Sequence, residues 1–357
     1  MSACWETSVT AALVERSVAG TVSPASRESL WSYVQGSGLD SLVLGASKDP
    51  NAKVTVLLVS PQSGRPVFAI KAPTTDAAAR AVEAEVQVLR ELEGIRLQQG
   101  SSTIPRVADF VEFGDRVGAV MTAVPGTPLT TLYLQWRHTR TARRVAADFA
   151  AVGAWLADFQ HATAGELGAL DMNGGVSSRL RARFPEDEEL DADLEWLARI
   201  YERLRGNAVP RTAVHGDFWS GNLLMNGQGL TGVVDWEAGS ISGEPVRDLV
   251  RFALMYALYL DRRTRHGRRV AGHHGLIAGT WGAGVEYALN GAGWFPERFR
   301  GFLRHGLERL GASPESWRDA ALAGIAEVAA VTDDHVFARS HLELLRRLRS
   351  AEGSRSI

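Results

Sequence analysis

The sequence predicts an α+β fold with two lobes, and two observations support this prediction. The first 122 residues contain five short runs of β-branched and apolar residues around one long helical pattern. After residue 122 the pattern changes, and long helical segments dominate. A chain of 357 residues is long enough for two such parts with a buried core. We therefore expect a first lobe over residues 1–122, a five-stranded antiparallel sheet with one helix, and a larger helical lobe over residues 123–357.

The five runs of the first lobe are predicted to be strands. They cover residues 41–44, 53–60, 66–71, 106–112 and 116–122. The turn at residues 61–64, Pro-Gln-Ser-Gly, separates the second run from the third and predicts a hairpin. Residues 76–92 then carry apolar side chains at helical spacing, with Val82, Val86 and Leu89 on one face. This segment predicts the helix of the lobe.

The second lobe begins with a loop at residues 125–128, Pro-Gly-Thr-Pro. Long helical patterns follow, notably at residues 141–164 and 190–204. A break at residues 209–214 leads into a polar segment, after which residues 230–236 form a β-like apolar run. From residue 245 on, the sequence is helical and rich in arginine.

Composition excludes several classes of function. The chain is 45% hydrophobic with a formal charge of −2, which gives no reason to expect a nucleic-acid or membrane-surface partner. Glu6 stands where a signal peptide would carry positive charge, and no segment reaches about 18 uninterrupted apolar residues. Cys4 is the only cysteine, so intramolecular disulfides and cysteine-rich zinc sites are excluded. We expect a cytoplasmic protein that is a monomer or a homodimer.

Lysine is rare in this chain. Lys48, Lys53 and Lys71 are the only lysines, and every other strong base is arginine. Such a bias is what a GC-rich genome would produce. A lysine that survives in this background is worth examining, although chance survival is an alternative for each of the three.

The polar segment of the second lobe has a spacing that suits phosphoryl transfer. His215-Gly-Asp217 is followed five residues after the aspartate by Asn222, and Asp235 stands thirteen residues further on, at the end of an apolar run. A loop carboxylate such as Asp217 can accept the proton of a hydroxyl that attacks phosphorus. The amide of Asn222 and the carboxylate of Asp235 are oxygen ligands of the kind that Mg²⁺ prefers.

These residues resemble the catalytic motifs of the aminoglycoside phosphotransferase family, which is related to choline kinase and to the eukaryotic protein kinases. The resemblance covers nearly the whole chain and implies a protein-kinase-like fold. It implies that Asp217 is the catalytic base and that Asn222 and Asp235 bind Mg²⁺. The family feature Gly-x-Pro-x-x-Asp-Leu is present as residues 243–249, where the resemblance gives Asp248 a structural role.

The first lobe agrees with this resemblance. Lys71 ends a predicted strand, as does the lysine that contacts the α- and β-phosphates in kinases. The carboxylate that holds it is either Glu85 or Glu83, and we favour Glu85 because residues 85–92 resemble the family pattern Glu-x-x-x-Leu-x-x-Leu. Both could instead be ordinary exposed charges of a helix.

Two further parts of the first lobe are predicted to contact the nucleotide. The loop at residues 45–53 stands where kinases carry a glycine-rich turn, and its main-chain amides with Ser47 could bind phosphate. Residues 121–124 join the lobes and should offer main-chain groups to the nucleobase, at Thr122 and Val124. Many relatives have a carboxylate near this point, so the choice between ATP and GTP stays open.

By resemblance, the acceptor site is predicted to lie between the segment 215–222, which resembles the family's catalytic loop, and the last helices. Aromatic planes suit sugar faces and carboxylates suit amino groups. The candidates are Trp219, Trp281, Glu286, Tyr287, Trp294, Asp333 and Asp334. For each of them a core or solvated role is the alternative.

The leading hypothesis is an O-phosphotransferase that moves the γ-phosphate of ATP or GTP to a hydroxyl of an antibiotic or related natural product, in resistance or self-protection. A metabolic kinase of a sugar, amino sugar, choline or homoserine is the second hypothesis. A nucleotide-binding pseudokinase scaffold is the third, and the presence of Lys71, Asp217, Asn222 and Asp235 together argues against it.

Overall fold

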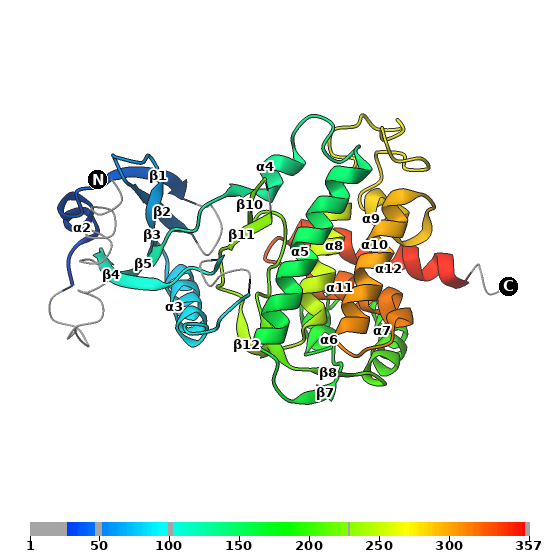
Figure 1. The fold of residues 1–357 in the computed structure, drawn as a ribbon. Coiled ribbons are helices and arrows are strands. Elements are labelled where there is room, and N and C mark those ends of the chain that lie inside the picture. Colours follow the sequence, from blue (N-terminus) through cyan, green and yellow to red (C-terminus); the bar gives the residue numbers. More distant parts are fainter. Residues whose placement is uncertain (1–26, 47–51, 99–102, 228, 354–357) are drawn as a thin grey trace. The chain divides into compact units, whose positions relative to one another are not determined.

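The computed structural model describes residues 27–46, 52–98, 103–227 and 229–353 (Figure 1). Its contacts divide the chain into two units. The first comprises Met1–Arg96, Gly100–Thr127 and Leu224–Gly239. The second comprises Leu97–Gln99, Pro128–Leu223 and Ser240–Ile357. The segment Leu224–Gly239 thus belongs to the first unit, although the residues before it, Pro128–Leu223, belong to the second.

The first unit contains the predicted five-stranded antiparallel sheet, in the order β1-β2-β3-β5-β4. Its strands are β1 (Asp40–Ala46), β2 (Lys53–Val59), β3 (Pro66–Pro73), β4 (Val107–Phe113) and β5 (Arg116–Thr122). All five lie close to the runs that the sequence predicts. The α+β fold class is therefore confirmed in this part of the chain.

Among the described residues, two helices pack on this sheet. The helix α2 (Leu30–Gly36) contributes Leu30, Tyr33 and Val34 to a core that includes Phe68 and Ile70 of β3. The helix α3 (Asp76–Glu91) begins at the N-cap Thr75, whose hydroxyl accepts a hydrogen bond from the main-chain N–H of Ala78. Side chains alternate along β3, so Phe68 and Ile70 point to one face and Lys71 points to the other. Contacts of α3 with β3 and β5 place this helix beside the sheet (Figure 1).

A smaller sheet is built from the segment that returns to the first unit. It has the order β11-β10-β6, with β6 (Thr127–Pro128), β10 (Leu223–Asn226) and β11 (Gly229–Val233). Gly126 has φ of +143°, and a Cβ at this position would collide with the Thr231 hydroxyl. Thr231 donates from the same hydroxyl to the carbonyl of Pro125 at 2.6 Å, so this turn lies directly against β11.

The second unit is mainly helical. Its helices are α4 (Leu129–Tyr133), α5 (Ala142–Ala162), α6 (Val176–Arg183), α7 (Leu190–Arg205), α8 (Val246–Leu258), α9 (Ala283–Asn290), α10 (Trp294–Arg309), the 3₁₀ helix η3 (Pro314–Ser316), α11 (Trp317–Val331) and α12 (His335–Gly353). The described part of this unit also contains two short antiparallel strand pairs. In one, β7 (Leu167–Ala169) pairs with β8 (Ala208–Pro210), and in the other, β9 (Thr212–Val214) pairs with β12 (Ser240–Gly243).

The helix α8 is the central helix of the second unit. It is apolar on nearly all sides, as expected of a helix that is surrounded by others. The ring of Phe252, on α8, packs edge-on against the ring of Phe149, on α5, with the ring centroids 5.2 Å apart. Gly324 of α11 packs against Val250 so closely that a Cβ at this position would clash. This closely packed helix also contacts residues 215–217, through Asp248 and Arg251.

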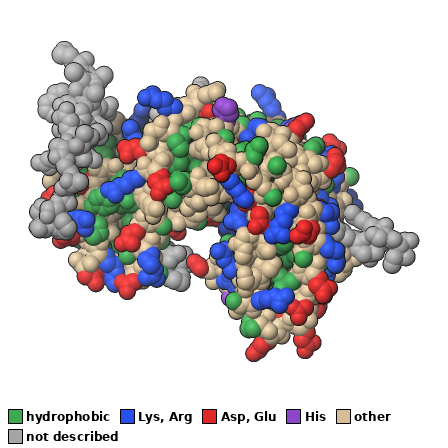
Figure 2. Space-filling model, turned by 90° about the horizontal axis from the view of Figure 1, so that it is seen from below, with side chains coloured by type: hydrophobic (Ala, Val, Ile, Leu, Met, Phe, Trp, Pro, Cys, Tyr) green, Lys and Arg blue, Asp and Glu red, His purple; other side chains and the backbone are tan. Residues whose placement is uncertain are grey.

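The surface of the molecule carries charges of both signs. In the face that Figure 2 shows, acidic and basic side chains are interspersed with apolar ones. Across the described residues, every helix is too short or too polar to cross a membrane.

Candidate active site

The predicted catalytic loop, residues 215–222, connects β9 to β10, and α8 fixes its start. Both carboxylate oxygens of Asp248, on α8, accept main-chain hydrogen bonds, Oδ2 from His215 at 2.6 Å and Oδ1 from Gly216 at 3.0 Å. Gly216 has φ of +79°, a conformation that strongly favours glycine. Burial raises the pKa of Asp248, while His215 and the two main-chain donors oppose the shift. This arrangement agrees with the structural role that the resemblance implies for Asp248.

The carboxylate of Asp217 is held from two sides. Arg251 donates from Nη2 to Oδ1 of Asp217 at 2.6 Å. Asn222 donates from Nδ2 to Oδ2 of the same carboxylate at 3.2 Å and to the main-chain oxygen of Asp217 at 2.9 Å. The Asp217 side chain is 34% exposed, so a hydroxyl can still approach it. The structure therefore brings the predicted base and the predicted amide ligand together within the second unit.

Sequence reasoning did not identify Arg251. The signal that could have found it is its place three residues after Asp248 in a helix, because residues three apart lie on the same face. One face of α8 thus contacts the catalytic loop twice, through Asp248 at the main chain and through Arg251 at the carboxylate.

A second cluster of charged side chains lies in the first unit. Lys71 Nζ donates to both oxygens of Glu85, at 2.7 and 2.6 Å, and to Oδ1 of Asp235 at 2.7 Å. Burial alone would lower the pKa of Lys71, but the two carboxylates raise it above its ordinary value. Glu85 is fully buried and also accepts from the main-chain N–H of Trp236 at 3.1 Å. Of the two candidate carboxylates on α3, Glu85 holds Lys71, whereas Glu83 is exposed.

The backbone of Asp235 has φ of +72°, an uncommon value for a residue with a side chain. Such outliers persist where the surroundings fix them. Here the contacts of Lys71 with Asp235 and of Glu85 with Trp236 hold both sides of the turn. The turn therefore aims the Asp235 carboxylate at Lys71.

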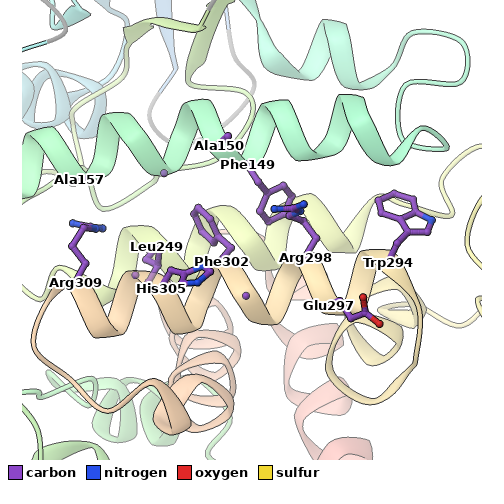
Figure 3. Close-up of a pocket in the computed structure, with 13 residues that line it drawn as sticks. Phe149, Ala150, Ala157, Leu249, Trp294, Glu297, Arg298, Phe302, His305 and Arg309 are labelled. Atoms are coloured by element: carbon purple, nitrogen blue, oxygen red, sulfur yellow. The ribbon is translucent and has the colours of Figure 1, made fainter.

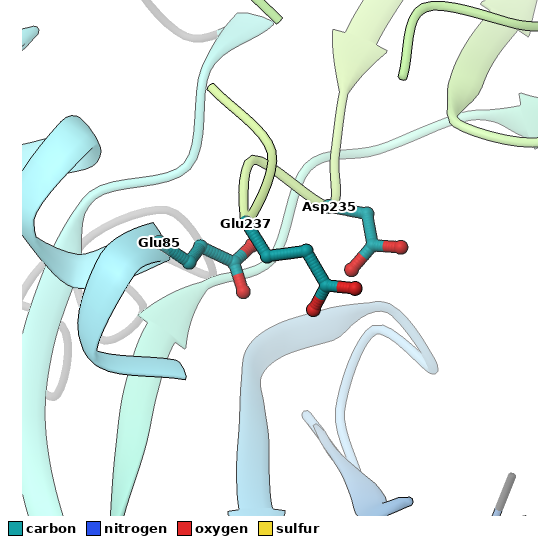
Figure 4. A group of neighbouring side chains, drawn as sticks. All are labelled: Glu85, Asp235 and Glu237. Carbon is teal, nitrogen blue, oxygen red and sulfur yellow. The ribbon is translucent and has the colours of Figure 1, made fainter. Parts of the chain in front are cut away.

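Lys53 and Glu237 complete this cluster, although the sequence predicted no role for Glu237. Lys53 Nζ donates to Oε2 of Glu237 and lies 3.5 Å from Oδ1 of Asp235. Figure 4 shows the three carboxylates of Glu85, Asp235 and Glu237 grouped together. One ligand atom from each lies within 4.8 Å of the others.

This donor set fits a divalent cation such as Mg²⁺. Carboxylate oxygens are the hard ligands that Mg²⁺ prefers, and it commonly takes one or two of them. In the second unit, Asn222 uses its Nδ2 for hydrogen bonds, which leaves the amide oxygen as the atom that would face a cation. Asn222 and Asp235 belong to different units.

Three further residues, Thr122, Val124 and Ser47, were predicted to contact the nucleotide. Thr122 ends β5, and its Oγ1 accepts from the main-chain N–H of Arg106 at 2.9 Å. Val124 packs against Gly232, where a Cβ would clash with its side chain. Ser47 lies outside the described residues.

The aromatic candidates for the acceptor site all pack within the second unit. The ring of Trp281 lies edge-on to His341, with centroids 4.7 Å apart. Tyr287 is 6% exposed, its ring lies parallel to Phe295 at 6.3 Å, and burial raises its pKa. Trp219 is half-buried in the catalytic loop itself, where it packs over Gly221.

The acidic candidates make local contacts. Glu286 accepts from Arg347 Nε at 2.6 Å, and Arg347 also donates to the carbonyl of Trp281. The carboxylate of Asp334 accepts from the main-chain N–H groups of Val336 and Phe337 at 2.8 and 3.0 Å, which caps α12. Asp333 is exposed, and its carbonyl accepts from Arg183.

Trp294, the remaining aromatic candidate, lines a groove on the second unit. This groove of about 590 Å³ runs between α5 and α10 and is lined by apolar side chains such as Phe149, Leu249 and Phe302, with Arg298 and Arg309 at its rim (Figure 3). The residues that line it do not include Asp217, Asn222 or Arg251. The catalytic loop is therefore not part of this groove.

Comparison with known proteins identifies the family. A family model described as the phosphotransferase enzyme family matches residues 51–284, well over half of the chain. A search of curated proteins finds no match.

Solved structures with a similar fold include three of the aminoglycoside phosphotransferase APH(4)-Ia. A thermostable mutant in the apo form is 15% identical, with 88% of this chain and 96% of that chain covered and a TM-score of 0.51. A second thermostable mutant, in a ternary complex with AMP-PNP and hygromycin B, is 14% identical, with coverage of 89% and 97% and a TM-score of 0.51. A further APH(4)-Ia structure is 15% identical, with coverage of 96% and 98% and a TM-score of 0.50.

At these identities the similarity concerns the fold, and it confirms the predicted protein-kinase-like architecture. The family match covers the segment that contains Lys71, Glu85, Asp217, Asn222 and Asp235. The chain belongs to the phosphotransferase enzyme family and is a small-molecule kinase.

Proposed function

We propose that this kinase transfers the γ-phosphate of Mg²⁺-bound ATP or GTP to a hydroxyl group of an antibiotic or related natural product. The observation that carries the proposal is the contact of Lys71 with both Glu85 and Asp235. A lysine fixed by a helix carboxylate is how kinases orient the group that binds the α- and β-phosphates. Asp235 at the same lysine would bring the metal next to those phosphates.

The roles of the remaining residues follow from their contacts. Asp217 would accept the proton of the acceptor hydroxyl, because its carboxylate is partly exposed and is oriented by Arg251 and Asn222. Asn222 and Asp235 would hold Mg²⁺, which neutralises charge on the transferred phosphoryl group when it is bound. Thr122, Val124 and Ser47 are proposed to contact the nucleotide.

The antibiotic as acceptor is supported by the family and by the ternary complex of APH(4)-Ia, whose fold accommodates AMP-PNP and hygromycin B together. For this chain the acceptor would lie in the second unit, near Asp217. Trp219 and Trp281 are proposed as its aromatic walls, with Glu286, Tyr287, Asp333 and Asp334 as further candidates.

The test is a screen of the purified protein for ADP or GDP release in the presence of Mg²⁺. The panel contains aminoglycosides, macrolides and other hydroxylated antibiotics, with sugars, amino sugars, choline and homoserine as the metabolic arm. Acceptor-dependent release with an antibiotic, abolished in Asp217→Asn, supports the proposal. If only a metabolic acceptor is phosphorylated, the antibiotic hypothesis is wrong and the metabolic hypothesis takes its place.

The metal role of Asp235 has its own test. Asp235→Ala should raise the concentration of Mg²⁺ needed for half-maximal activity, because one oxygen ligand is lost. Thr231→Ala, in the neighbouring strand β11, serves as the control. An identical Mg²⁺ titration in Asp235→Ala would remove Asp235 from the metal site.

A further inference from the structure

Lys53 and Lys71 lie on the same face of the sheet. In the register of β2 with β3, Thr55 stands opposite Lys71. Side chains two residues apart on a strand point to one face, so Lys53 shares the face of Thr55 and lies diagonally across from Lys71. Both lysines therefore reach the carboxylate of Asp235, which follows β11.

The contacts of Lys53 differ from those of Lys71. Lys71 bridges Glu85 and Asp235, whereas Lys53 bridges Glu237 and Asp235. The Lys53 side chain is only 13% exposed, which is unusually low for a lysine. An ammonium group so deeply buried is stabilised by the carboxylates that it contacts.

The charges of this cluster come close to balance. Glu85, Asp235 and Glu237 supply three negative charges, and Lys53 and Lys71 supply two positive charges. The same carboxylate oxygens are the ligands that a divalent cation would use. A cation on Asp235 and Glu237 would repel the ammonium of Lys53 and would take the oxygens that it contacts.

We propose that Lys53 is the resident counter-cation of the metal site: it holds Asp235 and Glu237 in place until a divalent cation binds, and that cation displaces it. Glu237 thereby becomes a further residue of the metal site in the first unit, beside Asp235. The inference rests on the proposed function, because it takes Asp235 as a metal ligand. It assigns to Lys53 a positioning role that is distinct from the phosphate-binding role of Lys71.

The small number of lysines allows a direct test. Reductive ¹³C-methylation of the protein labels only three lysine side chains, and the Lys53→Arg variant identifies the NMR signal of Lys53. Addition of Mg²⁺ without nucleotide should move this signal in a saturable way, because its ammonium leaves the two carboxylates. A Lys53 signal that stays unchanged up to saturating Mg²⁺ would overturn the proposal.

Cation affinity supplies a second measurement. Mn²⁺ binding, followed by electron paramagnetic resonance without nucleotide, should be about fivefold tighter in Lys53→Met than in the unmodified protein, since the competing charge is gone. In the Glu237→Gln background the same substitution should give a smaller gain, because one of the contested carboxylates is neutral. An unchanged or weaker Mn²⁺ affinity in Lys53→Met counts against displacement.

Arg116→Met is the matched control. It removes one positive charge from the same unit, at a side chain that pairs with Asp76 and Asp115 instead of the metal carboxylates. If it tightens Mn²⁺ binding as much as Lys53→Met, a general change in charge explains the effect and the proposal fails. Should Lys53→Met not fold, the NMR titration of the methylated protein that retains Lys53 decides.

Failure of the proposed function has a different signature. If the protein binds Mg²⁺-ATP and phosphorylates an acceptor, but the NMR signal of Lys53 does not respond to Mg²⁺, only the role of Lys53 is overturned. A Lys53 signal that responds to Mg²⁺ in a protein that binds neither ATP nor GTP would overturn the kinase assignment of the site and retain the counter-cation.

Discussion

Arg251 and Asp217 form an ion pair with 2.6 Å between Nη2 and Oδ1, so an arginine of α8 contacts the proposed catalytic base directly. The arginine side chain is 18% exposed. A guanidinium group at this distance fixes the direction of the carboxylate, and Asn222 fixes its second oxygen. A residue outside the catalytic loop thus helps to orient the proposed base.

Removal of Arg251 should therefore impair the chemical step more than nucleotide binding. Arg251→Ala is expected to lower kcat by about tenfold with little change in KM for the nucleotide, and Arg251→Lys should restore part of the loss. Steady-state kinetics of both variants checks this, with Arg203→Ala, at an exposed pair with Asp319, as the control. A uniform rise in KM without a fall in kcat would assign Arg251 to substrate binding instead.

Asp217→Asn should abolish transfer and leave nucleotide binding largely intact. The amide keeps the size of the side chain but can no longer accept a proton from the hydroxyl. Calorimetric titration with Mg²⁺-ADP and an assay of acceptor phosphorylation measure the two properties separately. Turnover close to that of the unmodified enzyme would exclude Asp217 as the base.

Lys71→Arg is expected to lower kcat/KM by at least about tenfold, which is about 1.4 kcal/mol of transition-state stabilisation. The compact ammonium of Lys71 contacts three carboxylate oxygens, and a planar guanidinium has a different reach and geometry. Lys48→Arg and Lys53→Arg should each cost less. The variants are compared at equal thermal stability, and undiminished activity in all three would show that Lys71 does not hold the nucleotide.

Two buried histidines make stability depend on pH. Burial lowers the pKa of His273 and of His341 to about 4. In the unfolded chain a histidine has a pKa of about 6.5, so below that pH the unfolded state binds more protons than the folded state. The stability that neutral His273 and His341 provide is complete above about pH 6.5 and is lost as pH falls towards about 4.

Urea unfolding at about pH 7 and about pH 5 measures this loss. We expect the free energy of unfolding to fall by on the order of 2 kcal/mol for each histidine between these values, since one pKa unit corresponds to about 1.4 kcal/mol. His273→Gln and His341→Asn keep a hydrogen-bond donor near the carbonyls of Thr139 and Phe337 and should flatten the dependence. A dependence that persists in the double variant would point to other titrating groups.

The sheet and the catalytic loop were predictable because their signals are local. Strands β2 and β3 have alternating apolar residues around a clear turn, and the spacing from His215 to Asn222 is short enough to read directly. The choice between Glu83 and Glu85 also had a local signal. Glu85 lies at helical spacing from Val82 and Leu89 on the buried face of α3, where a carboxylate needs a cation.

The partners of Asp217 and Glu237 were harder to predict because they come from distant parts of the chain. Arg251 stands 34 residues from Asp217, and Lys53 stands 184 residues from Glu237. Which of many arginines meets a given carboxylate depends on how the helices pack, and a single sequence does not contain that information. The contact of Glu286 with Arg347 likewise depends on tertiary structure. Asp334 instead caps the start of α12, which is a local contact.

The return of Leu224–Gly239 to the first unit has a consequence for synthesis on the ribosome. Proteins emerge from their N-terminus, and domains made of one continuous segment can fold as soon as that segment is complete. Lys71 must wait for Asp235, which is 164 residues later in the chain. Until then Lys71 and Glu85 have emerged without the aspartate that completes their cluster. A nascent or truncated chain that ends before Gly239 would therefore carry an incomplete first unit, which is exposed to chaperones and proteases during translation.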